Sequence, residues 1–212
     1  MLKDLPHELR AHAPFTAFGA LSGVAIMLVV VHSEVPRSIS GTLFWTLHPA
    51  HVLLSALVTS AMYRLHGKGG LGPTVLVGYV GSIGIATLSD SVIPYLGEYL
   101  LGLPNKGVHF GFIEKWWLVN PLALAGIAIA WFFPKTKFPH AGHVLLSTWA
   151  SLFHMTMALG ENVSVLTMCL IAVFLFLAVW VPCCTSDIVF PLLFSKEQAR
   201  LVHQESGSYQ RS

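Results

Sequence analysis

Three long stretches without any charged residue constrain this fold more than any other feature of the chain. They run over 18–31, 71–88 and 163–181, and none contains Asp, Glu, Lys or Arg. The two longer stretches reach the length of about 18 residues that is typical of membrane-spanning helices. Charged residues form only 10% of the chain, against about 25% in soluble domains. The sequence therefore predicts an all-α integral membrane protein.

Hydrophobic runs and turn residues divide the chain into six expected transmembrane helices. Their expected ranges are 14–34, 42–65, 72–102, 116–133, 139–159 and 164–194. The third and the sixth are longer than the roughly 20 residues that a bilayer needs. Each of these two contains a proline, Pro94 or Pro191. We expect a kink or a break there, because proline removes a backbone donor and clashes with the preceding turn.

Two short phrases occur twice in the chain, in the same order. HPAHVLLS at 48–55 returns 92 positions later as HAGHVLLS at 140–147. SDSVIP at 89–94 returns 97 positions later as SDIVFP at 186–191. Self-similarity at a nearly fixed offset is the signature of an internal duplication. We infer that the chain contains two copies of a three-helix unit.

The distribution of Lys and Arg predicts how the chain lies in the membrane. The predicted parts are an N-terminal segment 1–13, a first repeat 14–102, an external connection 103–115, a second repeat 116–194 and a tail 195–212. Nine Lys and Arg residues lie on the side of the two termini, and three lie on the other side: Arg37, Lys106 and Lys115. Because positive residues favour the cytoplasmic side, we expect a multi-pass protein of the cell membrane with both termini in the cytoplasm.

An odd number of helices in each copy determines how the two copies are related. After three crossings, the second copy enters the membrane from the opposite side, so the copies should be inverted repeats about a pseudo-two-fold axis in the membrane plane. In the first copy, His48, His51 and Asp90 should meet in the outer half of the membrane. Their counterparts in the inner half are His140, His143 and Asp187. The sequence leaves open whether the two triads form two sites or converge on one.

The repeated polar residues have the chemistry of ligands for a divalent transition metal. Histidines at i and i+3 share one helix face, and two imidazoles with one carboxylate suit zinc first, or else iron, cobalt, nickel or manganese. An acid inside a bilayer costs about 2.5–3.5 kcal/mol on insertion scales, and a bound cation would relieve that cost. The predicted metal ligands are His48, His51, Asp90, His140, His143 and Asp187.

The same residues also allow purely structural interpretations. Each His-x-x-His could join helices by hydrogen bonds, and the Ser-Asp pairs could cap a half-helix that begins near the proline. Ser55 and Ser147 fit either as hydrogen-bond donors to the ligands or as small residues that allow close packing. His154 could extend a polar path outward, although its repeat counterpart is Met62. Glu98 is the acid expected to guard the outer mouth.

Three functions agree with these features. The first is a transporter of a divalent transition-metal cation, for which proton coupling is available because ligands lose protons when they bind metal. The second is an intramembrane metalloenzyme, a hydrolase or oxidoreductase acting on a lipid-like substrate. The third is a b-type haem protein, although two histidines at i and i+3 cannot both bind one iron.

Two observations favour the transporter over the enzyme. No general base or nucleophile stands beside one triad alone, and an enzyme has little need of mirrored sites. The net charge of +2 gives no indication of a nucleic-acid partner. The expected partners are the lipid bilayer and the metal ion, and the sequence leaves open whether the protein forms a homo-oligomer.

Overall fold

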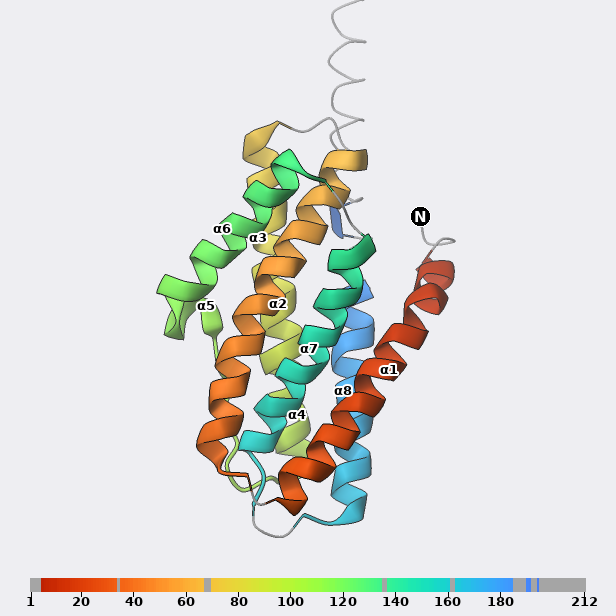
Figure 1. The fold of residues 1–212 in the computed structure, drawn as a ribbon, viewed down its shortest axis with the longest axis vertical. Helices are drawn as coiled ribbons and strands as arrows, with labels where there is room; N and C mark the ends of the chain where they lie inside the picture. The colour runs from red at the N-terminus through yellow and green to blue at the C-terminus, as the bar shows by residue number, and fades with distance from the viewer. Residues whose placement is uncertain are drawn as a thin grey trace, which may run out of the picture.

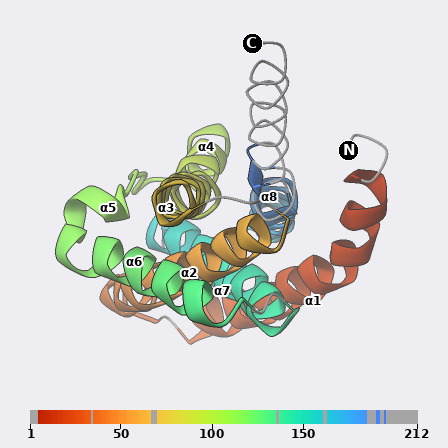
Figure 2. The same cartoon turned by 90° about the horizontal axis from the view of Figure 1, so that it is seen from above.

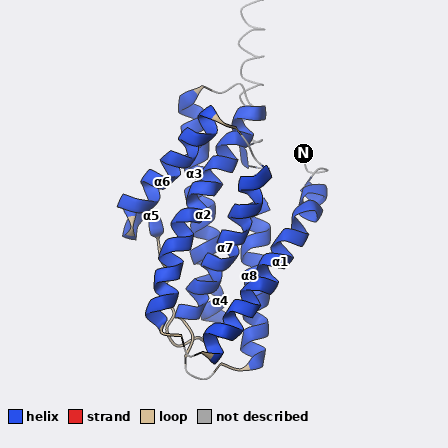
Figure 3. Cartoon of the chain, viewed as in Figure 1, coloured by secondary structure: helices blue, strands red, loops and turns tan. Residues whose placement is uncertain are grey.

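The computed structural model describes residues 5–33, 35–66, 70–134, 137–160, 163–184, 190–191 and 194. Within these residues the chain is helical and has no strand (Figure 3). The long helices are α1 (Leu5–His32), α2 (Arg37–His66), α3 (Leu71–Thr87), α6 (Trp116–Phe132), α7 (Lys137–Met157) and α8 (Val165–Cys184). Between α3 and α6 lie the π-helix η1 (Leu88–Val92), α4 (Ile93–Leu100) and the short α5 (Gly111–Glu114).

Each predicted helix corresponds to observed helical segments, and the third corresponds to α3, η1 and α4 together. α1 begins at Leu5, well before the predicted start at 14, and continues through Pro14. The predicted external connection contains α5. α8 is described as far as Cys184, and most of the segment around Pro191 lies outside the described residues. The predicted break at Pro191 is therefore not tested.

Two helical stretches are long and apolar enough to cross a membrane, as judged by length and composition alone. They are Arg37–Leu65 and Leu71–Leu100. The shorter apolar stretches are Ala17–His32, Trp116–Phe132 and Val165–Trp180. Large apolar side chains point outward on several helices, among them Phe18, Leu21, Leu76, Trp116, Phe132 and Val165.

α2 and α7 form the centre of the bundle. α2 packs on α7, α6 and α3, and α7 also packs on α1 and α8. Seen from above, α2 and α7 lie between α6 and α1 (Figure 2). The two central helices run in opposite directions (Figure 1). Hydrogen bonds place the start of α2 near the end of α7. The Arg37 side chain donates to the Asn105 backbone carbonyl, and the Asn105 backbone N–H donates to the Ala158 carbonyl.

Small residues allow α2 to approach its neighbours closely. A methyl group on Gly126 of α6 would lie 2.3 Å from the Leu53 carbonyl oxygen of α2. A methyl group on Gly78 of α3 would lie 2.0 Å from the Ser60 hydroxyl oxygen. Such contacts are typical of helix interfaces in membranes, where close packing replaces the hydrophobic effect between helices.

Gly126→Ala is expected to destabilise the fold by about 1–3 kcal/mol, because overpacking against a backbone carbonyl cannot be relieved by a rotamer change. The matched control is Gly84→Ala on α3, where a new methyl group would have no atom within 4 Å. Alanine is the better helix former, so this control should be neutral or stabilising. Thermal unfolding in detergent micelles measures both variants. An equal stability for the two would contradict the close α2–α6 contact.

We expected a kink or a break at Pro94. The structure has one π turn, η1, immediately before α4, and Pro94 lies in the first turn of α4. The Ile93 N–H donates to the Leu88 carbonyl, five residues back. In this register the Ser89 carbonyl would accept from residue 94, whose proline ring has no N–H. The Ser151 hydroxyl of α7 donates to the Ser89 carbonyl at 2.9 Å instead. The neighbouring helix thus replaces the missing donor. π turns of this kind are frequent at functional sites.

Candidate functional site

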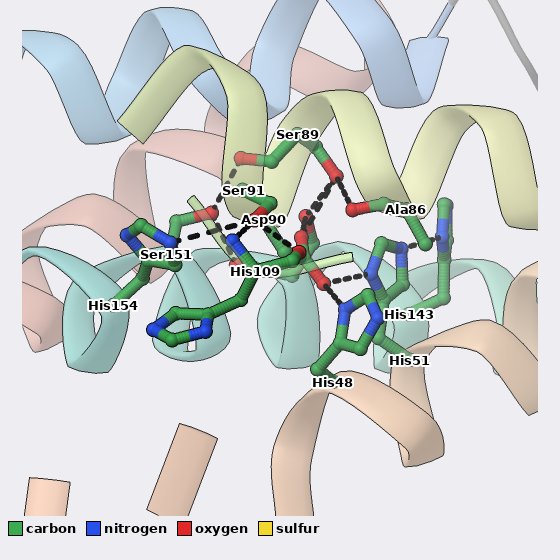
Figure 4. A network of polar contacts seen from close by, with 11 residues as sticks. His48, His51, Ala86, Ser89, Asp90, Ser91, His109, His143, Ser151 and His154 are labelled. Carbon is green, nitrogen blue, oxygen red and sulfur yellow. Dashed lines mark hydrogen bonds and ion pairs between the residues drawn. The ribbon is translucent and has the colours of Figure 1, made fainter. Parts of the chain in front are cut away.

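The buried carboxylate of Asp90, in η1, lies at the centre of a polar network (Figure 4). Its Oδ2 accepts hydrogen bonds from the Nδ1 atoms of His48 at 2.9 Å and His51 at 2.7 Å. Its Oδ1 accepts from the hydroxyls of Ser89 at 2.7 Å and Ser147 at 2.8 Å. A carboxylate offers about four lone-pair sites. All four are therefore used, and the charge is surrounded by donors.

Two polar stripes on the central helices provide most of these donors. Residues spaced by three or four positions share a helix face. On α2, the buried stripe comprises His48, His51, Ser55 and Thr59. On α7, the buried stripe comprises His143, Ser147, Ser151 and His154. Asp90 contacts both stripes through the hydrogen bonds described above, so three helices contribute to one site.

The two His-x-x-His phrases meet at this site. His143 Nδ1 lies 3.3 Å from His51 Nε2, and their ring centroids are 5.3 Å apart. These two residues occupy the same position in the two copies of the phrase, 92 residues apart. Contact between equivalent residues indicates that the copies share a centre. His143 of the second phrase therefore lies at the same site as His48 and His51 of the first.

His48 is held in place from its other side by close packing. A methyl group on Gly111 would lie 2.4 Å from His48 Nε2, so glycine is required for α5 to approach the imidazole. The Phe44 ring stacks on the His48 ring, with centroids 5.4 Å apart and an interplanar angle of 15°. The imidazole therefore has little freedom to turn away from the carboxylate.

The structure brings together most of the residues that the sequence singled out. His48, His51 and Asp90 lie together as predicted, and His143 from the second copy joins them. His140 lies in α7, but its side chain is outside what the structure describes, and Asp187 lies outside the described residues. Metal ligation by these residues remains a prediction.

Two imidazole nitrogens of the site have the separation expected of two metal ligands. Among the residues that the structure describes, no three His, Cys, Asp or Glu side chains are arranged as a metal site. His51 Nε2 and His143 Nδ1, 3.3 Å apart, nevertheless match the separation of about 3.3 Å between two nitrogen ligands of tetrahedral zinc. Asp90 would then orient His51 through the Nδ1–H bond, as carboxylates do behind zinc-bound histidines. This is a different role from the direct ligation predicted for Asp90.

A second buried acid–histidine pair lies nearby, and the sequence did not predict this contact. Glu98 Oε1 accepts a hydrogen bond from His154 Nδ1 at 2.8 Å, and both side chains are 1% exposed. From the sequence we expected both residues toward the outer mouth, but not in contact with each other. The only sequence signal for their contact is that His154 follows the face of α7 that carries His143.

Two further features bear on the alternative functions. A groove of about 510 Å³ lies between α2, α6 and α7, lined by Trp45, Thr46, Pro49, Ala50, Leu53, Leu54, Leu118, Leu122 and Leu146. None of the described histidines or acids of the site lines this groove. A porphyrin cannot fit between His51 and His143, whose facing nitrogens are 3.3 Å apart.

Comparison of the chain with known protein families, with curated proteins and with solved structures finds no match. A functional interpretation therefore depends on the chemistry of the site itself. Its central features are the buried carboxylate of Asp90 and the contact between His51 and His143.

Proposed function

We propose that this chain is a membrane transporter that carries a divalent transition-metal cation through one buried site, shared by two inverted three-helix repeats. The observation that carries the proposal is the 3.3 Å contact between His51 and His143, equivalent residues of the two copies, beside the buried Asp90. Sites at the interface between inverted repeats, formed near interrupted helices, are typical of secondary transporters.

The pattern of helix contacts supports the inverted-repeat part of the proposal. If α1, α2 and α3 correspond to α6, α7 and α8, each contact should have a counterpart. α2 packs on α6 as α7 packs on α1, α2 packs on α3 as α7 packs on α8, and α3 packs on α6 as α8 packs on α1. The central pair, α2 and α7, is its own counterpart. An antiparallel central pair is what a two-fold axis in the membrane plane requires.

The distribution of polarity supports a membrane location for the bundle. Large apolar side chains are exposed on the outside, including Phe132 at 72% and Val165 at 72%. The interior contains His48, His51 and Asp90, each no more than 1% exposed. A soluble protein of this size rarely exposes large apolar patches. The bias of nine to three in Lys and Arg favours the orientation with both termini in the cytoplasm.

Proton release would accompany cation binding at this site. His143 Nδ1 lies in hydrogen-bond contact with His51 Nε2, so a proton lies between the two nitrogens in the absence of a cation. A cation that binds both nitrogens must displace this proton, because metal ligands bind in deprotonated form. The proton leaves the site only if His143 is an imidazolium before the cation binds, since in a neutral imidazole it would move to Nε2 of the same ring. We propose the imidazolium form, whose charge is balanced by the ionised Asp90 behind His51. Asp90 stays charged and balances part of the positive charge of the ion. Uptake of metal and export of protons are thereby coupled.

The test of this proposal is transport by the purified protein in liposomes that contain a zinc-sensitive dye. We expect saturable zinc uptake accompanied by acidification of the outer medium. Calcium should be carried poorly, because it requires oxygen ligands and the site offers mainly imidazole nitrogens. Zinc uptake no faster than in protein-free liposomes would contradict the proposal.

A second candidate function is the transport of protons alone. The observation that favours it is that the four hydrogen bonds to Asp90 satisfy the carboxylate without a metal. Chains of His, Asp and Glu inside membranes serve as proton relays in pumps and transporters. A proton flux through the same liposomes that zinc neither drives nor inhibits would favour this function.

A further inference from the structure

We propose that Glu98 and His154 form a separate proton-binding site, which exchanges protons between the Asp90 site and the end of the bundle that carries the 103–110 connection. The inference rests on the proposed function, because it names the group that would take up the protons released by cation binding. It is carried by the burial of this pair and by its contacts toward both the Asp90 site and the surface.

The Glu98–His154 pair is buried as completely as Asp90 itself. Glu98 comes from α4 and His154 from α7, and their hydrogen bond is 2.8 Å long. The second carboxylate oxygen of Glu98 accepts the Gly107 N–H at 3.1 Å. A buried acid is costly unless it is paired and hydrogen-bonded. Both oxygens are here supplied with donors, so the pair can persist in the interior in a charged form.

Ser91 places this pair beside the helix turn that carries Asp90. It follows Asp90 in η1, and its Oγ lies 3.4 Å from His154 Nε2. The same hydroxyl accepts the His109 N–H at 2.9 Å and donates to the His109 carbonyl. Thus Nδ1 of His154 faces the acid, and Nε2 faces the helix turn that carries Asp90.

His109 connects the pair to the surface. Its ring centroid lies 5.4 Å from that of His154, and its Nδ1 donates to Glu114 at 3.1 Å. His109 and Glu114 are 30% and 41% exposed, so water reaches this end of the cluster. Phe44 packs against the rings of His109 and His154 and closes the cluster toward α2. The titratable groups therefore form a sequence from the surface inward.

The Glu98–His154 pair breaks the symmetry of the two repeats. The residue equivalent to His154 in the first copy is Met62, which cannot bind a proton, and the residue equivalent to Glu98 is Ser195. The central contact of His51 with His143, in contrast, uses the same residue type in both copies. The sequence thus has no equivalent pair at the corresponding positions of the other copy. A single pair suits a proton path that opens to one side of the membrane.

The pair can take up a proton without creating net charge in the interior. With Glu98 ionised and His154 neutral, the Nδ1–H lies in the hydrogen bond and the pair carries one negative charge. A proton released at the Asp90 site, or one that arrives from water by way of His109, binds His154 Nε2 and gives an imidazolium beside the carboxylate. The facing titratable groups are Glu98 on α4, His109 on the connection and, across Phe44, His48 on α2. Neutralisation of a buried charge is favourable in a medium of low dielectric constant.

The experiment is a histidine ¹⁵N NMR titration of the full chain in metal-free micelles, comparing the natural protein with Glu98→Gln. Glutamine keeps an oxygen that can accept the His154 hydrogen bond but removes the charge. We expect proton binding to His154 to weaken at least tenfold in this variant. The matched control is Glu114→Gln, which removes the exposed acid and should change proton binding to His154 less than twofold. His154→Met assigns the resonance.

The same variants in liposomes separate this inference from the proposed function. Glu98→Gln should retain zinc binding within about twofold and lose most of the proton release that accompanies zinc uptake. Equal proton affinity of His154 in Glu98→Gln and in the natural protein would overturn the inference, whether or not zinc is carried. A normal titration effect together with no zinc uptake by the natural protein would leave the proton site standing and refute the metal transport.

Discussion

Asp90→Asn is expected to lower zinc affinity about 100-fold, the upper end of the effect of removing the carboxylate behind a metal-bound histidine. Four donors point at the Asp90 carboxylate, from His48, His51, Ser89 and Ser147. Asparagine offers acceptors on its oxygen alone, and its NH₂ group would face two of these donors. The variant therefore loses both the charge and part of the orientation of His51.

The same substitution should also destabilise the fold, because buried donors that lose their acceptor cost about 1–3 kcal/mol. Isothermal titration with zinc and thermal unfolding in micelles measure the two effects. Ser147→Ala is the graded control: it removes one of the four hydrogen bonds and leaves the charge, so it should cost much less affinity. Zinc affinity within threefold of normal in Asp90→Asn would show that Asp90 does not support the cation site.

His51→Asn and His143→Gln are each expected to remove zinc binding, although the two residues lie in different copies of the repeat. Asparagine at 51 can still donate to Asp90 from the position of Nδ1, but it lacks the nitrogen that faces His143. When either histidine is replaced, only one of the two facing nitrogens remains to bind the cation. The double variant should therefore be little worse than either single variant, since residues that act as a unit are not additive.

Equilibrium dialysis of zinc against the four proteins of this cycle measures the coupling. Two independent triads would behave differently, because each single variant would keep one bound ion and only the double variant would lose both. Retention of half of the bound zinc in either single variant would thus contradict a shared site. Thr42→Ala changes an exposed residue in the early part of α2. It serves as the control that a substitution outside the site leaves zinc binding unchanged.

The first triad could be predicted from the sequence because local rules determine it. The spacing of His48 and His51 places both on one helix face, and the return of the chain in the third helix brings Asp90 back to them. The contact of His51 with His143 could not be predicted, because the sequence left open whether the two triads form one site or two. It depends on how closely α2 and α7 approach, and that distance is set by packing across the whole interface, which no single motif encodes.

The π turn η1 and its hydrogen bond from Ser151 could not be predicted from the sequence for a related reason. Pro94 indicated a disturbance of the helix, and we expected a kink or a break. The outcome is a π turn whose unsatisfied Ser89 carbonyl accepts from Ser151. A hydroxyl on another helix, 62 residues away in the chain, decides between these outcomes. The pairing of Glu98 with His154 depends in the same way on two helices from different copies.

The repeated phrase does not predict the contacts of its serine residues. Ser55 and Ser147 occupy equivalent positions, and the sequence left their roles open. Ser147 donates to Asp90, whereas the buried Ser55 hydroxyl has no hydrogen-bond partner among the described residues. Equivalent positions in the two copies thus differ in the contacts that the structure shows.

The most direct test of the shared site is anomalous X-ray diffraction from crystals grown with zinc, recorded at the zinc edge. We expect one peak per chain, within about 2.0–2.1 Å of both His51 Nε2 and His143 Nδ1. Two separate peaks, one beside His48 and Asp90 and another on the opposite side of the membrane, would contradict a shared site. The absence of any peak near these histidines, with zinc present in the crystal, would contradict metal binding itself.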